Sequence, residues 1–364
     1  MRPDTMSCMQ TLQVFAGARA RARLRDVGLR ARDVWAVPAA AGGPKGLVLN
    51  PLDRYLFGHW LRNAGGPVQL LGASIGAWRM AAACLSDPAA ALARLAQDYI
   101  TQRYAHAPGK APAPADVSAQ FGATLAQHFG GREAEVLQHA RYRLHVFTSR
   151  GRHLMRRQGR LRTPVGYAAA FVSNAVHRRA LGLWLQRVVF SDPRAPLRLP
   201  VHDLATAQVP LSVANLQRVV LASCSIPFWL NAVHDIPGAP PGAYWDGGIT
   251  DYHLHLDYAG GTDGLVLYPH FQPQVVPGWL DKPWRRRHRA TARLDNVVVL
   301  CPHPDWVARL PGGKLPDRSD FKAYADDDAG RERAWRRALA ESNRLAEAFD
   351  SLVQRAHIEA LPLP

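Results

Sequence analysis

Apolar and polar positions along this chain predict strands that alternate with helices. The apolar run in DVWAVPAAAGG predicts a short strand, and PKGLVLNPLDRYLFGHWL predicts an amphipathic helix after a glycine turn. PVQLLGAS then predicts a second strand, and IGAWRMAAACL predicts the helix that follows it. This order favours an α/β fold with a mostly parallel central sheet flanked by helices.

The rest of the chain continues to alternate between apolar patterns typical of strands and patterns typical of helices. Residues 89–138 have a helical pattern interrupted by the proline-rich HAPGKAPAPAD, and RLHVFTSR and LWLQRVVFSDP predict strands around a basic helical insertion at about 150–182. PLSVANLQRVVLASCSIPFWL predicts a helix that Ser212 is placed to cap and that ends before Pro227. GLVLYPHF and NVVVLCPH predict two further strands, and about 329–355 predicts a long C-terminal helix.

Residues 1–32 form a basic N-terminal segment, in which GARARARLRDVGLRARD predicts a basic helix followed by a loop. A transit peptide has a similar composition, but this pattern runs directly into core-like sequence. The chain contains no internal repeat and no linker long enough to separate two domains. We therefore expect residues 33–364 to form a single α/β domain that includes the insertion and the C-terminal helix.

Composition indicates a folded protein of the cytoplasm. Apolar residues make up 48% of the 364 residues, which allows a sizeable core. No run of eighteen apolar residues occurs, and the first residues lack the apolar core of a secretory signal. Cys8, Cys84, Cys224 and Cys301 have neither metal-site nor redox spacing, so we expect reduced core thiols.

A serine lies on the turn between the second strand and its helix, in Gly72-Ala73-Ser74-Ile75-Gly76. A serine at the tip of such a turn has strained backbone geometry, and the residues two before and two after it must be small. Gly72 and Gly76 meet this demand, and the helix N-terminus favours negative charge beside Ser74. The pattern predicts a nucleophile, while a glycine-bounded turn without chemistry is the simpler alternative.

The glycine loop GGPKG, residues 42–46, follows the first strand and opens a helix. Its backbone N–H groups would face Ser74 across the end of the sheet, where an oxyanion hole belongs. The spacing is not that of a P-loop or of a dinucleotide-binding fingerprint. The expected donors are the backbone amides of Gly42, Gly43, Lys45 and Ile75.

Asp246 precedes two glycines in AYWDGGITDYH, so its carboxylate lies on a tight turn at the end of an aromatic stretch. A carboxylate in this position would accept the proton of Ser74 directly. Tyr244 and Trp245 would partly desolvate it and raise its pKa from about 4, which makes it a stronger base.

The blocks AGGPKG, GASIG, ASCSIP and DGG, in that order over about residues 34–251, resemble the motifs of the patatin-like phospholipase family. The resemblance implies a patatin-like three-layer fold and a Ser74–Asp246 dyad without a catalytic histidine. It implies a carboxylic ester hydrolase that cleaves acyl esters of lipids, like phospholipase A or lysophospholipase, through an acyl-serine intermediate and without cofactor or metal. Ala41 replaces the first glycine of the family's usual triple but keeps its N–H, and a lysine replaces the commoner arginine. The other motif glycines are Gly46, Gly72, Gly76, Gly247 and Gly248.

Charge suggests how such an enzyme would reach a lipid. The chain has 45 Lys and Arg against 29 Asp and Glu, a formal net charge of +16, which attracts polyanions such as nucleic acid or anionic headgroups. WLDKPWRRRHR, from Trp279 to Arg289, adds tryptophans to a basic cluster, and HLMRRQGRLR is also basic. For a lipid hydrolase this combination favours peripheral contact with an anionic membrane over nucleic acid. A solvated loop is the simplest alternative.

Two other chemistries remain open. An esterase or thioesterase triad of α/β-hydrolase type would use His303, in VLCPHPDW, but it leaves the DGG and ASCSIP blocks unexplained. His253 and His255, two apart in DYHLHLDY with Asp251 and Asp257 alongside, would suit zinc or iron if they share one strand face. A merely polar strand face is the simpler expectation.

A protein of a different class also stays open, since the chain could be a non-catalytic lipid-binding or partner-binding protein that keeps the fold. A binding module has no need for Ser74 and Asp246 in their two turns. The sequence leaves open the acyl chain, the headgroup, and whether the ester is a phospholipid, a neutral lipid, a polyester or a thioester.

Overall fold

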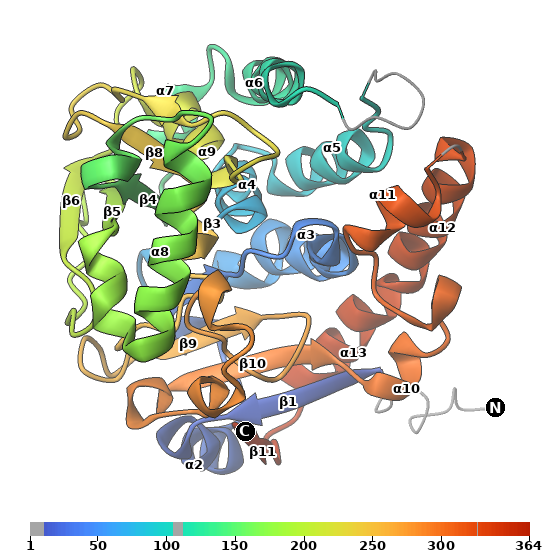
Figure 1. The fold of residues 1–364 in the computed structure, drawn as a ribbon. Coiled ribbons are helices and arrows are strands. Elements are labelled where there is room, and N and C mark those ends of the chain that lie inside the picture. Colours follow the sequence, from blue (N-terminus) through green and yellow to red (C-terminus); the bar gives the residue numbers. More distant parts are fainter. Residues whose placement is uncertain (1–10, 105–111, 326) are drawn as a thin grey trace.

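The computed structural model describes residues 11–104, 112–325 and 327–364, and it has the α/β architecture expected from the sequence (Figure 1). Within these residues the strands are β1 Leu12–Ala16, β2 Val34–Ala39, β3 Val68–Ala73, β4 Tyr142–Gly151, β5 Leu185–Ser191, β6 Thr206–Pro210, β7 Val233–His234, β8 Ala243–Trp245, β9 Leu265–Pro269, β10 Val297–Pro302 and β11 Leu361–Pro362.

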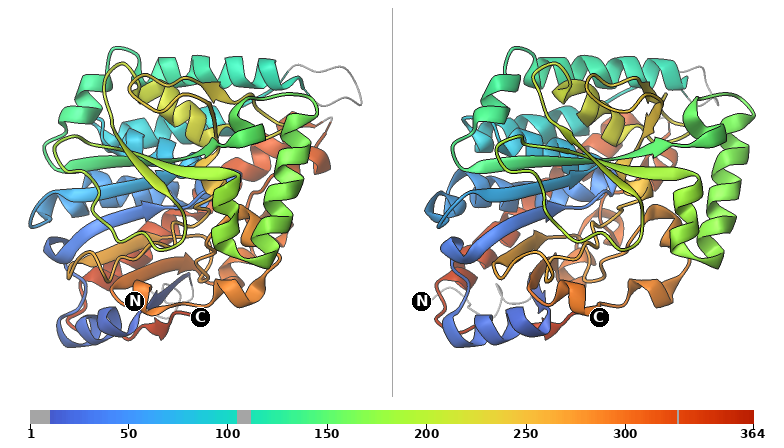
Figure 2. Two further views of the ribbon diagram at one scale, coloured as in Figure 1. Left: turned by 60° about the vertical axis from the view of Figure 1, so that its left-hand side comes forward. Right: turned by 90° about the vertical axis from the view of Figure 1, so that its left-hand side faces the viewer.

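These strands form one mostly parallel sheet. Its order is β11-β1-β10-β9-β2-β3-β4-β5-β6, with β8 pairing beside β4 and β7 beside β8. The five strands from β10 to β4 are all parallel, whereas β1 is antiparallel to β10, and β5 and β8 are antiparallel to β4. Figure 2 shows the strands as a twisted sheet through the middle of the molecule.

The α-helices of the described residues are α2 Ala18–Val27, α3 Asn50–Gly58, α4 Ile75–Ala83, α5 Pro88–Ile100, α6 Pro114–Phe129, α7 Glu133–Gln138, α8 Arg162–Val176, α9 Leu216–Cys224, α10 Pro304–Val307, α11 Ser319–Ala323, α12 Asp328–Glu341 and α13 Asn343–Val353. Short 3₁₀ helices that matter below are η2 Gly43–Leu49, η4 His153–Arg156, η5 Arg178–Leu183, η6 Gly247–Ile249, η7 Trp279–Asp281 and η8 Arg285–His288. In this part of the chain no helix is both long and apolar enough to cross a bilayer.

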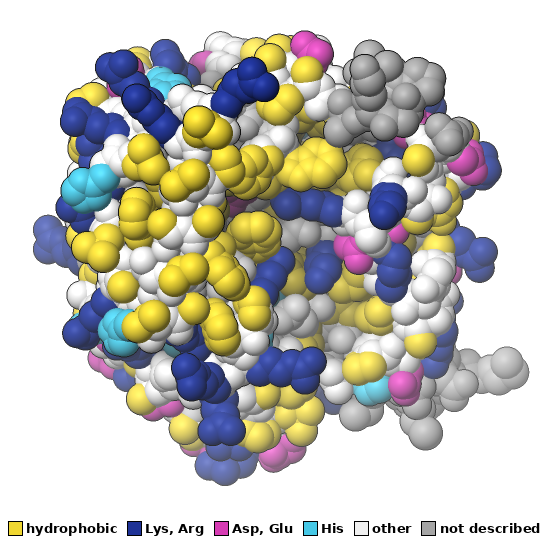
Figure 3. All heavy atoms as spheres, in the orientation of Figure 1, with side chains coloured by type: hydrophobic (Ala, Val, Ile, Leu, Met, Phe, Trp, Pro, Cys, Tyr) yellow, Lys and Arg dark blue, Asp and Glu magenta, His cyan; other side chains and the backbone are white. Residues whose placement is uncertain are grey.

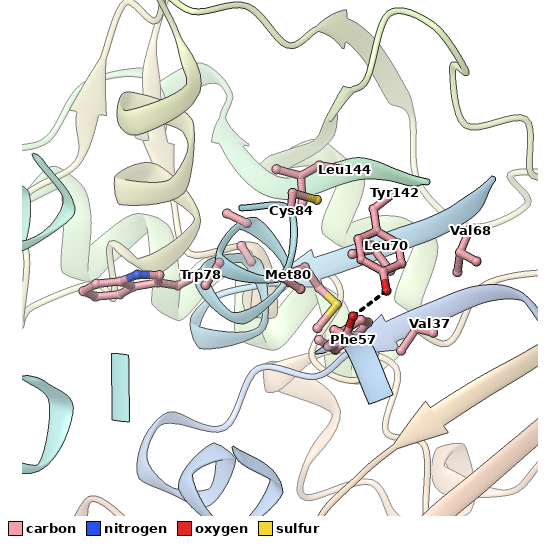
Figure 4. Close-up of a cluster of buried hydrophobic side chains, with 14 of the residues drawn as sticks. Val37, Phe57, Val68, Leu70, Trp78, Met80, Cys84, Tyr142 and Leu144 are labelled. Carbon is pink, nitrogen blue, oxygen red and sulfur yellow. Dashed lines mark hydrogen bonds between the residues drawn. The ribbon is translucent and has the colours of Figure 1, made fainter. Parts of the chain in front are cut away.

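Both faces of the sheet are buried, because successive side chains of a strand point to opposite faces. Val37 and Leu70 lie in the core on the face covered by helices, together with residues of α3, α4, α9 and α13. Ala36 and Leu71 lie on the opposite face, which is covered mainly by the irregular connections on either side of β9. Figure 4 shows part of the helix-covered core, where Tyr142 O–H donates a hydrogen bond to a main-chain carbonyl of α3 at 2.9 Å.

The two strand–turn–helix units that the sequence predicts are present as β2-η2-α3 and β3-α4. The predicted strands around the insertion are β4 and β5, and the two later ones are β9 and β10. The insertion itself folds as η4, α8 and η5 and packs Tyr167 against Trp245, with ring centroids 5.8 Å apart. The proline-rich segment lies partly outside the described residues, and its last three residues already belong to α6.

Three local expectations differ from the structure. The predicted long C-terminal helix is divided into α12 and α13 at Ser342, whose hydroxyl donates to the carbonyl of Ala338 at 2.6 Å. Ser212 does not cap α9 with its side chain. Its own N–H instead donates to Asn215 Oδ1 at 2.9 Å, and Asn215 is the residue before the helix. The basic N-terminal segment contains the predicted helix, α2, but also β1, which the sequence did not indicate.

Three of the four cysteines are free and buried, as expected of core thiols: Cys84, Cys224 and Cys301. Cys8 lies outside the described residues.

Candidate active site

Ser74 lies on a sharp turn between β3 and α4. Its φ of 56° and ψ of −131° belong to a region that non-glycine residues seldom adopt. A Cβ on Gly72 would lie 2.4 Å from Cα of Ala77, and one on Gly76 would lie 2.0 Å from the carbonyl oxygen of Ala39. Both glycines are therefore required by close approach of the backbone, for the steric reason that the sequence suggested.

The structure brings Ser74 and Asp246 together. Ser74 Oγ donates a hydrogen bond to Asp246 Oδ2 at 2.6 Å, and the other carboxylate oxygen accepts the N–H of Gly248 at 2.7 Å. A Cβ on Gly247 would lie 2.0 Å from the carbonyl oxygen of Phe147, so the turn can approach β4 only with glycine there. The two residues are 172 positions apart in the sequence and are almost fully buried.

Burial changes the acidity of this carboxyl group. It raises the pKa of Asp246 to about 6, although the hydrogen bond from Ser74 and the positive charge of Arg318 act in the opposite direction. Asp246 is therefore mostly ionised at neutral pH and is a stronger base than an exposed aspartate.

Ser223, in the ASCSIP block, holds the serine turn from behind. Its Oγ accepts the N–H of Ser74 at 2.9 Å and donates to the carbonyl of Phe147 at 2.7 Å. Two residues later, the carbonyl of Ser225 accepts the N–H of Asp246 at 2.9 Å. The block thus joins the serine turn to the aspartate turn, a role that the sequence analysis did not assign to either serine.

Ser149, on β4, is a second contact that the sequence did not reveal. Its hydroxyl donates to the carbonyl oxygen of Asp246 at 2.9 Å and lies 3.0 Å from Thr250 Oγ1. Nothing in the strand pattern around Ser149 marks it, because its partner comes from a segment 97 residues away.

The glycine loop lies beside Ser74, as expected. Gly42 and the side chain of Lys45 line the same cavity as Ser74, and Gly43 opens η2 with a φ of 58°. Among the described residues, the N–H groups of Gly42, Gly43 and Ile75 donate to no other protein group. These three amides are therefore free to bind an oxyanion, and the N–H of Lys45, which belongs to η2 as that of Gly43 does, stays a candidate donor.

Gly46 closes the glycine loop and is less constrained, because an added Cβ would make ordinary contacts with the side chains of Arg79, at 3.5 Å, and Ile75, at 3.7 Å. The guanidinium of Arg79 forms two hydrogen bonds with Asp53 of α3, at 2.7 and 2.9 Å, and both residues are buried. This ion pair ties α4 to α3 beneath the loop.

Ser74 and Asp246 open onto a cavity of about 250 Å³. Its walls come from the glycine loop, from Ile226 and Pro227 after α9, from Trp279 and Lys282 around η7, and from residues 317–319. Figure 3 shows a hollow in the surface beside the apolar side chains of α8, in the orientation of Figure 1.

His303 does not join the site. Its Nδ1 accepts the N–H of Asp305 and caps α10. It follows β10, three strands away from β3, which corresponds to about 14 Å across the sheet. Among the described residues neither Ser74 nor Asp246 bonds to His303, so the geometry does not favour a triad.

The histidines of DYHLHLDY do not share a face, because residues 253–258 are not a strand. His253 is buried, and its Nδ1 accepts the N–H of Val276 at 3.0 Å. The two carboxylates are bound elsewhere, Asp251 to Arg187 and Asp257 to His202. The described residues contain no group of His, Cys, Asp or Glu placed to hold a metal ion.

The fold and site together define an α/β protein with a serine elbow and a carboxylate partner. No family model matches the sequence, and no curated protein matches it. The solved structures that are similar to the chain include the following two. Human GIVD cytosolic phospholipase A2 has a TM-score of 0.41 and 10% identity over 92% of this chain and 62% of that one. VipD from Legionella pneumophila has a TM-score of 0.37 and 13% identity, and the match covers 87% of this chain and 67% of the VipD chain.

The chain thus spans less than two thirds of the length of the phospholipase structure.

Proposed function

We propose that this protein is a serine hydrolase that cleaves acyl esters of lipids, in the manner of a phospholipase A or a lysophospholipase. The observation that carries the proposal is the 2.6 Å hydrogen bond from Ser74 Oγ to buried Asp246, formed on a strained turn at a helix N-terminus. A serine with an adjacent base beside free backbone amides is the arrangement that acyl transfer requires.

In the first step, Ser74 Oγ attacks the ester carbonyl while its proton passes to Asp246. The N–H groups of Gly42 or Gly43 and of Ile75 stabilise the oxyanion, and each such donor contributes about 3 kcal/mol. The proton then passes from Asp246 to the leaving alcohol oxygen, which leaves an acyl-serine.

In the second step, Asp246 accepts a proton from water, which attacks the acyl-serine at the same carbonyl. The second tetrahedral intermediate uses the same amides, and Ser74 recovers its proton when the fatty acid leaves. The mechanism uses groups of this chain only and calls for neither cofactor nor metal.

Exposed apolar side chains beside the cavity support a lipid substrate. Val172 and Val176 on α8 are 62% and 81% exposed, and Phe228 and Trp229, just after cavity-lining Pro227, are more than half exposed. The backbone of Phe228 has a φ of 71°, which bulky residues rarely adopt. Figure 3 shows an apolar surface over α8 next to the hollow.

We also propose that this face makes peripheral contact with an anionic membrane from the cytoplasmic side. Trp279 lines the cavity and is 41% exposed, and Arg285 and Arg286 on η8 are exposed. Arg287 has a structural role instead, because it binds the carboxylate of Asp281 at 2.7 Å. Tryptophans at the headgroup level and nearby arginines are a common combination at membrane surfaces.

Labelling with a fluorophosphonate probe tests the nucleophile without knowledge of the substrate. We expect labelling of the parent protein on Ser74 and none in Ser74→Ala, which should keep its fold. Turnover of a short-chain p-nitrophenyl ester should fall at least about 10⁴-fold in Ser74→Ala and comparably in Asp246→Asn.

His303→Ala serves as the matched control and should retain turnover near the parent value. A dead His303→Ala with an active Asp246→Asn would replace the dyad with a triad. A folded parent that neither reacts with the probe nor hydrolyses esters would indicate the non-catalytic binding protein.

A further inference from the structure

Gly42 of the glycine loop lies directly against the ring of Phe271. A Cβ on Gly42 would lie 2.6 Å from Cε1 and 2.8 Å from Cζ of that ring. Among the described residues, the three atoms nearest to this Cβ position, beyond the adjoining residues, all belong to Phe271. The φ of Gly42 is 167°, outside the left-handed region that favours glycine. The close approach of Phe271 therefore accounts for glycine at this position.

The sheet brings these two residues together. β2 and β9 are parallel neighbours, so both strands end at the same edge of the sheet. Gly42 comes three residues after β2, and Phe271 comes two residues after β9. The loop is also tied to the segment after the aspartate turn, because the N–H of Ala41 donates to the carbonyl of Tyr252 at 2.9 Å. The glycine loop thus has two fixed contacts next to its free amides.

Phe271 has little freedom to move. It is 5% exposed and packs against the rings of His270 and His253, with ring centroids 4.4 and 5.3 Å away. His253 Nδ1 accepts the N–H of Val276 at 3.0 Å. His270 Nδ1 accepts the N–H of Gln272, also at 3.0 Å. A ring packed among fixed neighbours gives Gly42 a firm surface, because a close-packed interior deforms little.

The two histidines that support Phe271 are neutral. Burial is the main cause that lowers the pKa of His253 well below its usual value and the pKa of His270 to about 3. Nε2 of each ring is buried and has no hydrogen-bond partner among the described residues. An unpaired buried polar atom weakens a fold, so stability alone does not account for these two side chains. What both rings share is their contact with Phe271.

We propose that Phe271 is a positioning residue for the oxyanion hole, because its ring sets the place of Gly42 and so directs the free N–H groups of Gly42 and Gly43 toward the developing oxyanion. The inference rests on the proposed hydrolase function and adds a residue that lies outside the four sequence blocks. An oxyanion hole works because its donors are in position before the reaction, and a misplacement of about 1 Å can cost roughly 100-fold in rate.

The first test replaces the ring with a smaller apolar side chain. We expect Phe271→Leu to reduce kcat for a short-chain p-nitrophenyl ester at least 10-fold and to change KM less than 2-fold, because the amides bind the oxyanion more strongly than the ester. Phe349→Leu is the matched control, since it removes the same atoms from a buried ring on α13 and should keep kcat near the parent value. A single cooperative thermal transition checks that each variant folds. If Phe271→Leu does not fold, Phe271→Met retains more volume and should show the same change in kcat.

A trifluoromethyl ketone analogue of the ester separates positioning from general damage. Ser74 Oγ adds to the ketone carbon, its proton passes to Asp246, and the ketone oxygen becomes an oxyanion. The inhibition constant of this ketone should rise in Phe271→Leu by the factor by which kcat/KM falls. The corresponding ether has no carbonyl carbon to attack, and its inhibition constant should stay near the parent value.

A double-mutant cycle tests the contact between the two residues. We expect Gly42→Ala to reduce kcat/KM at least 100-fold in the parent, because its methyl group would meet the ring of Phe271. In the Phe271→Leu background the same change should cost at least 10-fold less, because leucine lacks the two ring carbons nearest to Gly42.

Parent values of kcat and of ketone affinity in Phe271→Leu would overturn the role of Phe271 while the hydrolase proposal stands. So would equal costs of Gly42→Ala in both backgrounds, or an equal loss of kcat in Phe349→Leu. A parent that neither hydrolyses the ester nor binds the ketone, or a Ser74→Ala variant that keeps turnover, would overturn the hydrolase proposal itself.

Discussion

At Asp246, burial and hydrogen bonding act on the same carboxyl group in opposite directions. Burial dominates and raises its pKa to about 6, while the Ser74 hydroxyl and the charge of Arg318 favour the ionised form. A carboxylate with an ordinary pKa would be a weak acceptor for a serine proton. The raised pKa strengthens the base but leaves it ionised at pH 7.

The pH dependence of hydrolysis should follow this one group. Since Asp246 must be ionised to accept the proton of Ser74, we expect kcat/KM for a neutral soluble ester to fall as pH decreases through about 6. The limiting slope should be tenfold per pH unit. An aspartate of ordinary pKa would hold full activity down to about pH 4.5.

Temperature separates this carboxyl group from a histidine of similar pKa. Ionisation of a carboxyl group has a small enthalpy, so the midpoint should hardly move between 15 and 35 °C, whereas that of an imidazole moves clearly. His303→Ala should give the same profile as the parent. A midpoint that moves with temperature, or that disappears in His303→Ala, would contradict the role of Asp246.

The sequence predicted those site residues whose constraint is local. Gly72 and Gly76 could be inferred because strand and helix meet at Ser74, and the structure shows backbone atoms within 2.4 Å of where their Cβ atoms would lie. The roles of Ser223 and Ser149 could not be inferred. Ser223 binds the N–H of Ser74, 149 residues away, and Ser149 binds the carbonyl of Asp246, 97 residues away. A serine that binds a distant main-chain atom has no periodic signal in the sequence.

Among the elements, α8 has the most unusual surface. Its buried side packs Tyr167 against Trp245, beside the aspartate turn, while Val165, Val172 and Val176 are more than half exposed. η8 packs against the end of the helix, where an Nη1 atom of Arg287 donates to the carbonyl of Asn174. The helix therefore presents apolar side chains to solvent from a well-anchored position.

Replacing two of these valines should weaken attachment to lipid without harming the fold. We expect Val165→Ser with Val172→Ser to reduce binding to anionic vesicles about 30-fold, because each exposed valine that enters lipid contributes roughly 1 kcal/mol. Vesicle sedimentation measures the binding. Turnover of a soluble short-chain ester should remain near the parent value.

The control for this pair is Val201→Ser with Val213→Ser. These valines are 45% and 56% exposed, and neither lines the cavity. Equal binding by both double variants and the parent would show that α8 does not enter the lipid.

Elements with a strong local period were the ones that the sequence predicted. β3 and α4 are mostly apolar and meet at a glycine-bounded turn, and β9 and β10 are continuous apolar runs. The break at Ser342 was missed because the charge pattern continues on both sides of it. β1 was missed because its residues are mostly half-buried and its position depends on pairing with β10.

At the scale of the whole molecule, the net charge of +16 should set the dependence of membrane binding on lipid and salt. We expect stronger binding to anionic than to zwitterionic vesicles, weakened as salt is raised from 50 to 500 mM, because screening shortens the reach of the attraction. Arg285→Ser with Arg286→Ser should weaken binding to anionic vesicles further. Arg287 stays unchanged, because its loss would leave Asp281 without one of its partners.

Arg21→Ser with Arg30→Ser removes the same charge from exposed positions on and just after α2. This control should bind anionic vesicles more tightly than Arg285→Ser with Arg286→Ser does. If the two double variants were equally weakened, total charge rather than the η8 arginines would govern attachment. Equal binding of the parent to both lipids at every salt concentration would exclude an electrostatic contribution.

The pairing of β1 has a consequence for synthesis on the ribosome. β1 hydrogen-bonds to β10 and β11, so the 280 residues from 17 to 296 must be translated before its main partner exists. At 5–20 residues per second this takes roughly 15 to 60 s. For that interval the first strand has no neighbour, and its unpaired main-chain groups are available to other nascent chains or to a chaperone. The edge of the sheet next to β10 is thus among the last parts of the molecule to form.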